Sequence, residues 1–209
     1  MLEILESKKI YDIFLSCLQK YAGKINADRI LNELGLRGAK NENFLKIFSV
    51  IAPKYMTSSR VQKCMMEIIE KLRGLVIIKI SPAEIEMQMD EEATLRVFVT
   101  NNTGLSLRFT VIAEQAGKKI SSLLYDSKKG YSLPSIQQSF PIENERTHMF
   151  KFLLRTDLFE IRDLYELKKS GEIEIPINVY VQADHIDGMK IGPMKAKVKI
   201  VKVKKLEYE

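Results

Sequence analysis

The side chains best suited to metal or acid–base chemistry are scarce in this chain. It has two histidines, His148 and His185, and the second lies in the run Asp184-His185-Ile186-Asp187. An imidazole beside carboxylates can hold a cation. The segment nevertheless offers few oxygen ligands, and Asp187-Gly188 is a common turn pair. A solvated loop is therefore the favoured interpretation, with His148 expected at the start of a strand.

The two cysteines, Cys17 and Cys64, fall on the apolar faces of two expected helices. Neither belongs to a Cys-x-x-Cys pair, so the spacing gives little support to a zinc site. Buried thiols behave as small hydrophobic groups, and we expect both cysteines to be reduced core residues. A disulfide is the alternative if the two helices pack together, although a cytosolic location disfavours it.

Sequence motifs of the common enzyme classes are missing from the 209 residues. The chain contains no Gly-x-x-x-x-Gly-Lys, Gly-x-Gly-x-x-Gly, Gly-x-Ser-x-Gly or His-Glu-x-x-His. With two histidines and two separated cysteines, a nucleophile and base pair has little to draw on. Paired carboxylates remain conceivable, but no spacing selects a pair. We therefore predict a protein that is not an enzyme, with no cofactor, no metal and no small-molecule substrate.

A row of lysines near the end of the sequence is the most prominent charged feature. The lysines first alternate with Ala196 and Val198, as in a strand with one wet face. Ile200-Val201 then shifts the alternation, which predicts a β-bulge. The candidate contact residues for an anion or a nucleic acid are Lys195, Lys197, Lys199, Lys202, Lys204 and Lys205.

Two interpretations fit this lysine row. It is either a basic stripe that contacts phosphates or an edge strand that lysine protects against pairing with other sheets. No aromatic residues interleave the lysines, so the sequence does not suggest base stacking. Acidic strand faces elsewhere, such as Glu84 and Glu86, are possible partners for the lysines. The edge interpretation is the favoured one.

Composition and charge describe an ordinary globular chain with a basic first part. The hydrophobic fraction is 45% and the net charge is +6. Residues 1–74 carry 13 Lys/Arg against 8 Asp/Glu, whereas residues 75–209 carry 20 against 19. No apolar run approaches the roughly 20 residues that span a bilayer, and the first residues do not resemble a signal peptide. We expect a cytoplasmic protein that does not enter a membrane.

Four short amphipathic helices are expected in the first 74 residues. Apolar side chains at helical spacing predict one from Ile10 to Tyr21 and a second capped by Asn26. A third spans residues 41–52, and the fourth begins at Ser59 with a capping-box spacing to Gln62. Helices this short are not stable alone, so they must pack on one another, on the rest of the chain or on a partner.

The second and third helices have the scale of a helix-turn-helix, with Gly35 in the connection. The third helix is very apolar and offers only Lys46 and Lys54 as cations, whereas a recognition helix needs a polar face toward the bases. The connection from Gly35 to Lys40 is also longer than the usual tight turn. DNA binding by this segment is therefore disfavoured.

After Gly74 the hydrophobic pattern changes to alternation with period 2. About seven strands follow, with a short helix that Asp157 caps and Gly171 ends, and the pattern does not assign the segment at 117–144. A strand ending in Asn101-Asn102-Thr103-Gly104 and followed by another strand resembles immunoglobulin-like domains. This resemblance is one of pattern over residues 75–205, since the chain has no Trp and no Cys after Cys64.

The expected architecture is α+β: a helical domain at 1–74, then an antiparallel immunoglobulin-like β-sandwich at 75–209. Sandwiches of this type present sheet faces, edges and loops to other proteins. We therefore predict a non-enzymatic interaction or scaffold protein that binds another protein or a second copy of itself. The alternative is a nucleic-acid-associated protein that uses the basic helical segment or the lysine row.

Overall fold

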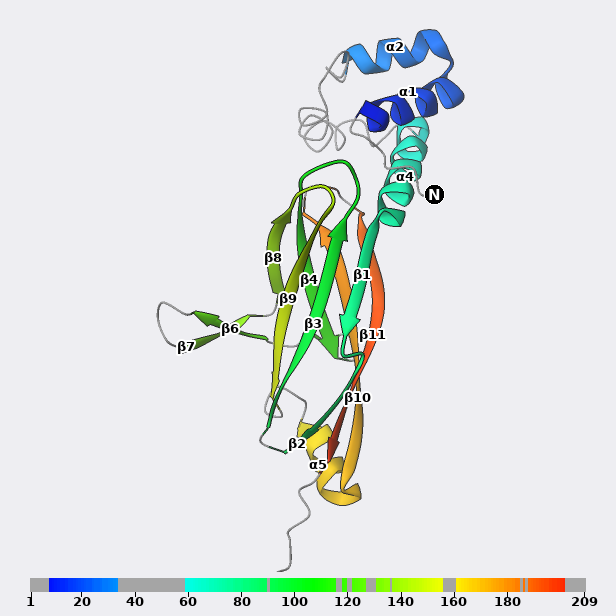
Figure 1. Cartoon of the computed structure of the whole chain (residues 1–209). Helices are drawn as coiled ribbons and strands as arrows, with labels where there is room; N and C mark the ends of the chain where they lie inside the picture. Colours follow the sequence, from blue (N-terminus) through cyan, green and yellow to red (C-terminus); the bar gives the residue numbers. More distant parts are fainter. Residues whose placement is uncertain are drawn as a thin grey trace, which may run out of the picture.

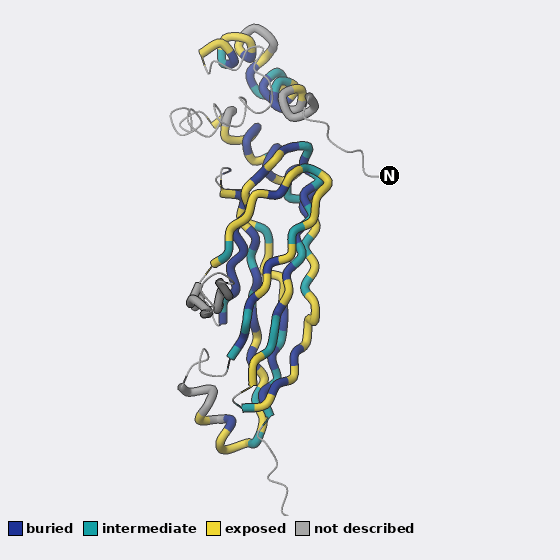
Figure 2. Tube along the Cα trace, turned by 60° about the vertical axis from the view of Figure 1, so that its left-hand side comes forward, coloured by how far each residue is buried: buried dark blue, intermediate teal, exposed yellow. Residues whose placement is uncertain are grey.

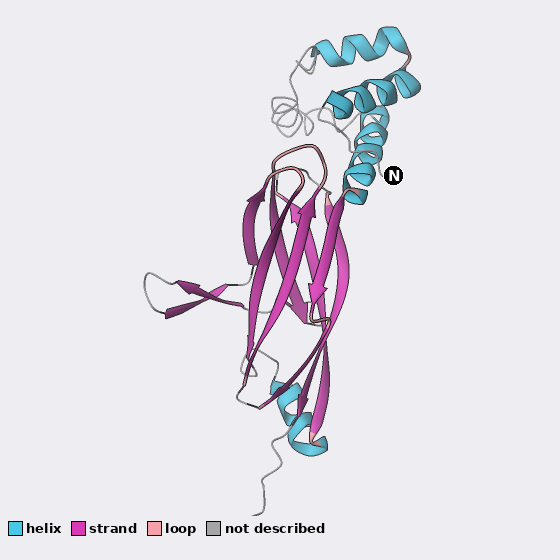
Figure 3. Cartoon of the chain, in the orientation of Figure 1, coloured by secondary structure: helices cyan, strands magenta, loops and turns pink. Residues whose placement is uncertain are grey.

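The computed structural model of the chain describes residues 8–33, 59–89, 91–115, 118–119, 122–126, 131–135, 137–155, 161–184, 186 and 188–201. Helices lie at the two ends of a long β-structure (Figure 3). The described helices are α1 (Lys8–Ala22), α2 (Lys24–Glu33), α4 (Ser59–Gly74) and α5 (Ile161–Ser170). None of the described helices is long and apolar enough to cross a membrane.

The described strands number eleven, more than the seven or so expected. They are β1 (Val76–Ser81), β2 (Glu84–Gln88), β3 (Glu92–Asn101), β4 (Leu107–Gln115), β5 (Lys118–Lys119), β6 (Ser122–Asp126), β7 (Tyr131–Ser135), β8 (Gln137–Ile142), β9 (Arg146–Arg155), β10 (Glu172–Ala183) and β11 (Lys190–Val201). Seven of them coincide with the predicted strands. The other four, β5 to β8, fall within the segment 117–144 that the sequence pattern left unassigned.

Nine of these strands form two sheets (Figure 1). The three-stranded sheet has the order β1-β3-β9 and is antiparallel throughout. The six-stranded sheet has the order β2-β11-β10-β4-β5, with β8 also paired to β4. Its strands are antiparallel except for the β2–β11 pair, which is parallel. Strands β6 and β7 form a separate two-stranded hairpin. The fold is therefore mixed α+β with strands predominating.

A single apolar core fills the space between the two sheets. Along β3, β9, β10 and β11 buried residues alternate with more exposed ones over most of each strand. Figure 2 shows such alternation as changes of colour along the strands. The largest fully buried side chains of the strands are Phe109, Phe150, Phe152, Leu95 and Leu107. Full burial of one such side chain stabilises the fold by about 1.5–3 kcal/mol. Because successive side chains of a strand point to opposite faces, the residues between the buried ones lie on the outer faces of the sheets.

One chain segment links the two sheets at their edge. Strand β1 pairs with β3 in the three-stranded sheet and ends at Ser81. Pro82 has no N–H for a β-ladder, and the chain then continues as β2 beside β11 in the other sheet. The N–H of Lys197 donates to the carbonyl of Ala83 at 2.8 Å, which fixes the start of this second pairing.

The helical segment packs on one end of the sheets and shares their core. Phe14, Cys17 and Leu18 of α1 are buried with Cys64 and Ile68 of α4 in the same cluster as the strand residues. Asn26 is not the helix cap that the sequence suggested. Its side-chain N–H donates to the carbonyl of Ala22 at 3.0 Å, because α2 already begins at Lys24, directly after Gly23.

The transition from helix to strand is tight. Helix α4 ends at Gly74 and β1 begins at Val76. The N–H of Leu75 donates to the carbonyl of Leu72 at 3.1 Å, and the carbonyl of Leu75 accepts the N–H of Asn102 at 3.1 Å. The change in sequence pattern at residue 74 therefore marks a real change of element, while the division into separate domains at 1–74 and 75–209 stays a prediction.

Candidate functional site

The lysine row predicted from the sequence begins on the outer face of the six-stranded sheet. Lys195, Lys197 and Lys199 lie on β11 on the side opposite the buried Ala196 and Val198. The remaining candidate residues, Lys202, Lys204 and Lys205, lie outside the described part of the chain. The structure thus places three of the six predicted contact residues on one strand face.

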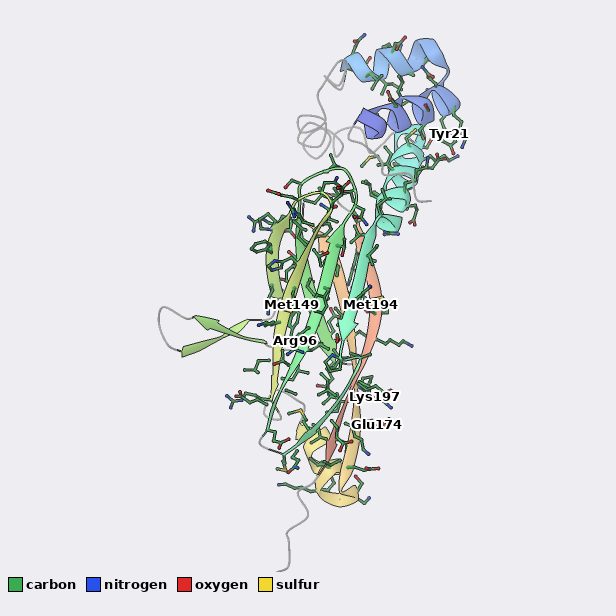
Figure 4. All side chains as sticks on the ribbon, in the orientation of Figure 1. Tyr21, Arg96, Met149, Glu174, Met194 and Lys197 are labelled. Atoms are coloured by element: carbon green, nitrogen blue, oxygen red, sulfur yellow. The ribbon has the colours of Figure 1, made fainter. Side chains whose placement is uncertain are left out.

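Two of these lysines are bound to glutamates of the neighbouring strand. Lys197 Nζ lies 3.0 Å from Glu174 Oε1; Figure 4 labels both residues. Lys199 Nζ lies 3.0 Å from Glu172 Oε2. The hydrogen bond from each lysine to its glutamate raises the pKa of that lysine. These pairs are solvent-exposed, so each contributes little to stability by itself.

Glutamates also flank the lysines on their other side. The parallel register places Glu84 of β2 beside Lys197. Glu86 of the same strand lies beside Lys199. Each of these two lysines therefore lies between acidic residues of two neighbouring strands, and the pattern is a ladder of opposite charges rather than a basic stripe.

Two sequence-based expectations about this strand are wrong. From Lys197 to Val201, β11 is not an edge strand, because β10 pairs with one side and β2 with the other. The predicted bulge at Ile200-Val201 is also absent, since Ile200 pairs with Ile173 in unbroken register. The register shift lies instead near the other end of β11, opposite residues 179–181 of β10.

The outer face of the three-stranded sheet has a different composition. The strand register gives three rows across β1, β3 and β9, which are Ile77-Thr100-Thr147, Lys79-Phe98-Met149 and Ser81-Arg96-Lys151. The side chains of one row approach each other, because Thr100 Oγ1 and Thr147 Oγ1 are 2.7 Å apart. We call Lys79, Arg96 and Lys151 the cationic cluster.

Apolar side chains lie on the same face, beside the cationic cluster. Ile77 is 42% exposed and Met149 is 36% exposed, while Phe98 between the two outer strands is half-buried. Arg96 and Met149 come from adjacent strands of the sheet nearest the viewer in Figure 4. We call Ile77, Phe98 and Met149 the apolar row. A face that combines exposed apolar area with charge is the composition expected of a binding surface.

The cationic cluster has no carboxylate partner among the described residues. All three of its side chains are exposed. The ion pair found on this face joins Arg155 to Glu92 at 3.9 Å, at the far end of β3 and β9. The cluster was missed in the sequence because Arg96 and Lys151 are 55 positions apart, and only the β3–β9 register brings them together.

The residues singled out for metal chemistry are engaged elsewhere or lie outside the described part. The carboxylate of Asp184 accepts hydrogen bonds from Thr110 Oγ1 and, at 2.9 Å, from Ser139 Oγ. His185 and Asp187 are outside the described residues. In the described part, no three His, Cys, Asp or Glu side chains are grouped to hold a metal ion.

His148 lies within strand β9 rather than at its start. Its ring stacks on Phe140 with centroids 3.7 Å apart and meets the edge of Phe150 at 4.8 Å. Burial lowers the pKa of this imidazole, because the charged form loses solvation between the two rings. The histidine therefore contributes packing between β8 and β9.

The two cysteines are free and buried where α1 meets α4. Burial raises the pKa of both thiols, which disfavours their reactive thiolate forms. Cys17 Sγ donates to Glu67 Oε2 at 3.6 Å, and Tyr21 Oη donates to Glu67 Oε1 at 2.5 Å. Lys20 Nζ also bonds Glu67 Oε1, at 3.1 Å. This cluster holds the two helices together and has no nucleophile poised for chemistry.

The helix-turn-helix hypothesis concerns residues that the structure describes only in part. Its first helix corresponds to α2, which ends at Glu33 in the described chain. The connection and the expected helix at 41–52 lie outside the described residues. The hypothesis therefore stays a disfavoured prediction.

Comparison with known proteins gives no family for this chain. No family model matches it, and no curated protein matches it. Solved structures with some likeness include the CARDB domain of a Pyrococcus furiosus protein, with TM-score 0.33 and 14% identity over 61% of this chain and 85% of that one. A FixG-related protein from Vibrio parahaemolyticus gives TM-score 0.35 and 9% identity, covering 61% and 94%.

A third structure with some likeness is an alkylpurine DNA glycosylase from Pseudomonas fluorescens. It gives TM-score 0.34 and 12% identity over 88% of this chain and 49% of that one. All three TM-scores are too low to support an argument about function. Any functional conclusion must therefore come from the chain's own residues.

Proposed function

We propose that the chain is a non-enzymatic protein-interaction module that binds its partner on the outer face of the three-stranded sheet. The observation that carries the proposal is the apolar row, where Ile77 and Met149 are exposed next to the half-buried Phe98. Scattered exposed apolar residues are normal, but here Phe98 and Met149 are directly opposite each other and Ile77 lies one row further along the same face. Such patches on rigid sheets serve as contact surfaces.

We further propose that the sheets form an immunoglobulin-like β-sandwich. The orders β1-β3-β9 and β11-β10-β4 correspond to the A-B-E and G-F-C orders of immunoglobulin domains. Domains of this architecture act in many binding proteins, although fold alone does not specify function. In this proposal the sandwich is the rigid support that keeps the apolar row in place.

The helical segment is a candidate for a second contact. Met66 of α4 is 56% exposed, whereas its neighbours Met65 and Ile68 are buried. Because α4 runs directly into β1, a partner on the helices and a partner on the sheet face would be held in a fixed relation. This arrangement fits a scaffold that joins two proteins or two copies of the chain.

The alternative, a nucleic-acid-associated protein, has less support from the contacts. Its main candidates, Lys197 and Lys199, are paired with glutamates and flanked by further acidic residues. A duplex-binding surface needs cations free to replace the counterions of phosphates. Lys202, Lys204 and Lys205 lie outside the described residues and keep this alternative as a prediction.

Co-purification of the tagged full-length chain tests the proposal, with and without nuclease. We expect a stoichiometric protein partner that survives nuclease treatment and is depleted about tenfold by Met149→Glu. Tyr165→Glu is the control, because Tyr165 is 66% exposed on α5, outside the three-stranded sheet. Equal loss with both variants, or a companion that disappears with nuclease, would contradict the proposed surface.

A further inference from the structure

The cationic cluster violates the pairing rule that the rest of the sheets follow. Arg96 and Lys151 are directly opposite each other in the β3–β9 register, and both point to solvent. Like charges directly opposite on neighbouring strands are destabilising. On the other sheet, Lys197 and Lys199 of β11 lie opposite Glu84 and Glu86 of β2 and form ion pairs with Glu174 and Glu172 of β10. The uncompensated pair is therefore a local departure in a protein whose acidic residues are plentiful.

Lys79 extends this cluster diagonally. It lies opposite Phe98, which is two residues from Arg96 on the same strand. Neighbouring strands are about 4.8 Å apart and same-face residues along a strand about 7 Å apart. Three cations therefore occupy an area that one or two carboxylates can cover.

The apolar row indicates which side chains of a bound segment should lie next to its carboxylates. Met149 and Phe98 form the row next to Arg96 and Lys151, and Ile77 lies one row further. In an extended segment, side chains on the same face are also about 7 Å apart. A segment with the pattern acid-x-apolar-x-apolar thus places its carboxylate on Arg96 and Lys151 when its apolar side chains meet the apolar row.

A nucleic acid fits this surface less well. Strands that bind single-stranded nucleic acid combine a basic groove along the backbone with several stacking aromatics. Among the described residues this face has one aromatic side chain, the half-buried Phe98, and its cations form a compact group rather than a track. Ile77 and Met149 are aliphatic, so they can pack against apolar side chains of a protein but provide no ring on which a base can stack.

We infer that the outer face of the three-stranded sheet receives an acidic protein segment in extended conformation, with carboxylates on Arg96 and Lys151 and apolar side chains on Met149 and Phe98. The inference rests on the proposed interaction function and specifies the chemistry of the partner. It assigns a role to the cationic cluster, whose mutual repulsion the partner's carboxylates would relieve.

Binding of designed peptides to the full chain tests this inference by fluorescence anisotropy. The first probe is a labelled peptide of about ten residues in which Glu and Leu follow the acid-x-apolar-x-apolar pattern. The second has Lys in place of every Glu, and the third is a single-stranded oligonucleotide of about 20 nucleotides. We expect the acidic peptide to bind, more weakly at higher salt, and the basic peptide not to bind.

Charge-reversing variants then locate the site. Arg96→Glu and Lys151→Glu should each weaken binding of the acidic peptide by about tenfold or more. Lys195→Glu is the matched control, because Lys195 is an exposed lysine on the other sheet opposite Asn178, and it should leave binding unchanged. Thermal unfolding followed by circular dichroism checks that each variant is folded.

Three outcomes would overturn the inference: equal binding of acidic and basic peptides, equal loss with Lys195→Glu, or tighter binding of the oligonucleotide, which would assign the face to nucleic acid. Absence of peptide binding, while Met149→Glu still removes the co-purifying protein, would refute the partner chemistry and leave the proposed function standing. Failure of both tests would refute the proposed function itself.

Discussion

The outer faces of the two sheets both carry cations but arrange them in different ways. On the six-stranded sheet, Lys197 lies between Glu84 and Glu174 of the flanking strands. On the three-stranded sheet, Arg96 lies opposite Lys151, with Lys79 diagonal to it. On the first face Lys197 and Lys199 are paired with glutamates, whereas the three cations of the second face have no carboxylate partner among the described residues.

This difference shows why a count of basic residues is a poor guide to a binding surface. The lysine row of β11 is conspicuous in the sequence, yet the structure uses two of its members in ion pairs. The cationic cluster is inconspicuous in the sequence, yet none of its three members has a carboxylate partner in the described part. What distinguishes the two faces is the identity of the cross-strand neighbours.

The largest predicted effect concerns Asn101, a buried residue whose hydrogen bonds connect the two sheets. Asn101 of β3 is fully buried, and its amide N–H groups donate to the carbonyls of Leu105 at 2.7 Å and of Ile142 at 2.8 Å, the latter on β8 of the other sheet. Its side-chain oxygen accepts the N–H and the hydroxyl of Thr103. Asn101→Ala should lower the free energy of unfolding by about 3 kcal/mol, because several buried polar groups lose their partner.

Urea unfolding followed by circular dichroism measures this loss. The control is Asn102→Ala, because the described contact of Asn102 uses its backbone N–H, which alanine keeps. We expect the control to change stability by about 0.5 kcal/mol or less. Similar losses in both variants would show that the buried amide of Asn101 does not join the sheets in the way described.

A smaller effect is expected on the outer face of the six-stranded sheet, where charge reversal at Lys197 and at Lys195 should change the melting temperature by different amounts. Lys197→Glu places an additional carboxylate between Glu84 and Glu174, where the wild-type ammonium lies. We expect the melting temperature to fall by about 2 °C, a modest change because the group is exposed. Lys195→Glu, opposite the neutral Asn178, should change it less. The reverse order would contradict the charge ladder.

The smallest predicted effect is the pH dependence at the contact between the sheets. His148 is packed between Phe140 and Phe150, and burial lowers its pKa below the ordinary 6.5. Near pH 6.5 and below, His148 binds a proton more readily in the unfolded chain than in the folded chain. The free energy of unfolding therefore falls as the pH drops below that value. His148→Phe should make stability less dependent on pH between 7 and 5. An unchanged slope in urea titrations would assign the dependence to other groups.

Local patterns were sufficient to predict most of the elements. The helical period predicts α4 and the alternation predicts β3 and β10, because each burial pattern is contained in one continuous stretch. The strands from β5 to β8 were not predicted, since Gly, Ser, Pro and Lys interrupt their short segments. The predicted edge position of β11 failed because the β2 pairing depends on a distant segment.

The candidate surface could not be predicted from local sequence patterns either, because its residues come together only through strand pairing. Arg96 and Lys79 each read as a polar residue on the wet face of a strand, and nothing nearby in the sequence identifies their cross-strand neighbours. For Asn101 a signal was present: it shares the parity of the buried Val97 and Val99, which indicates an inward side chain. The turn pattern around it concealed that position.

The most direct test of the central claim is a paired measurement of stability and binding on one variant, Lys151→Glu. The substitution places a carboxylate opposite Arg96, so it should raise the free energy of unfolding by about 0.5 kcal/mol. The same variant should bind the acidic peptide about tenfold more weakly. That combination would mean that the chain keeps an unfavourable charge pair for its partner. A variant that is less stable, or that binds as well as the wild type, would contradict the account.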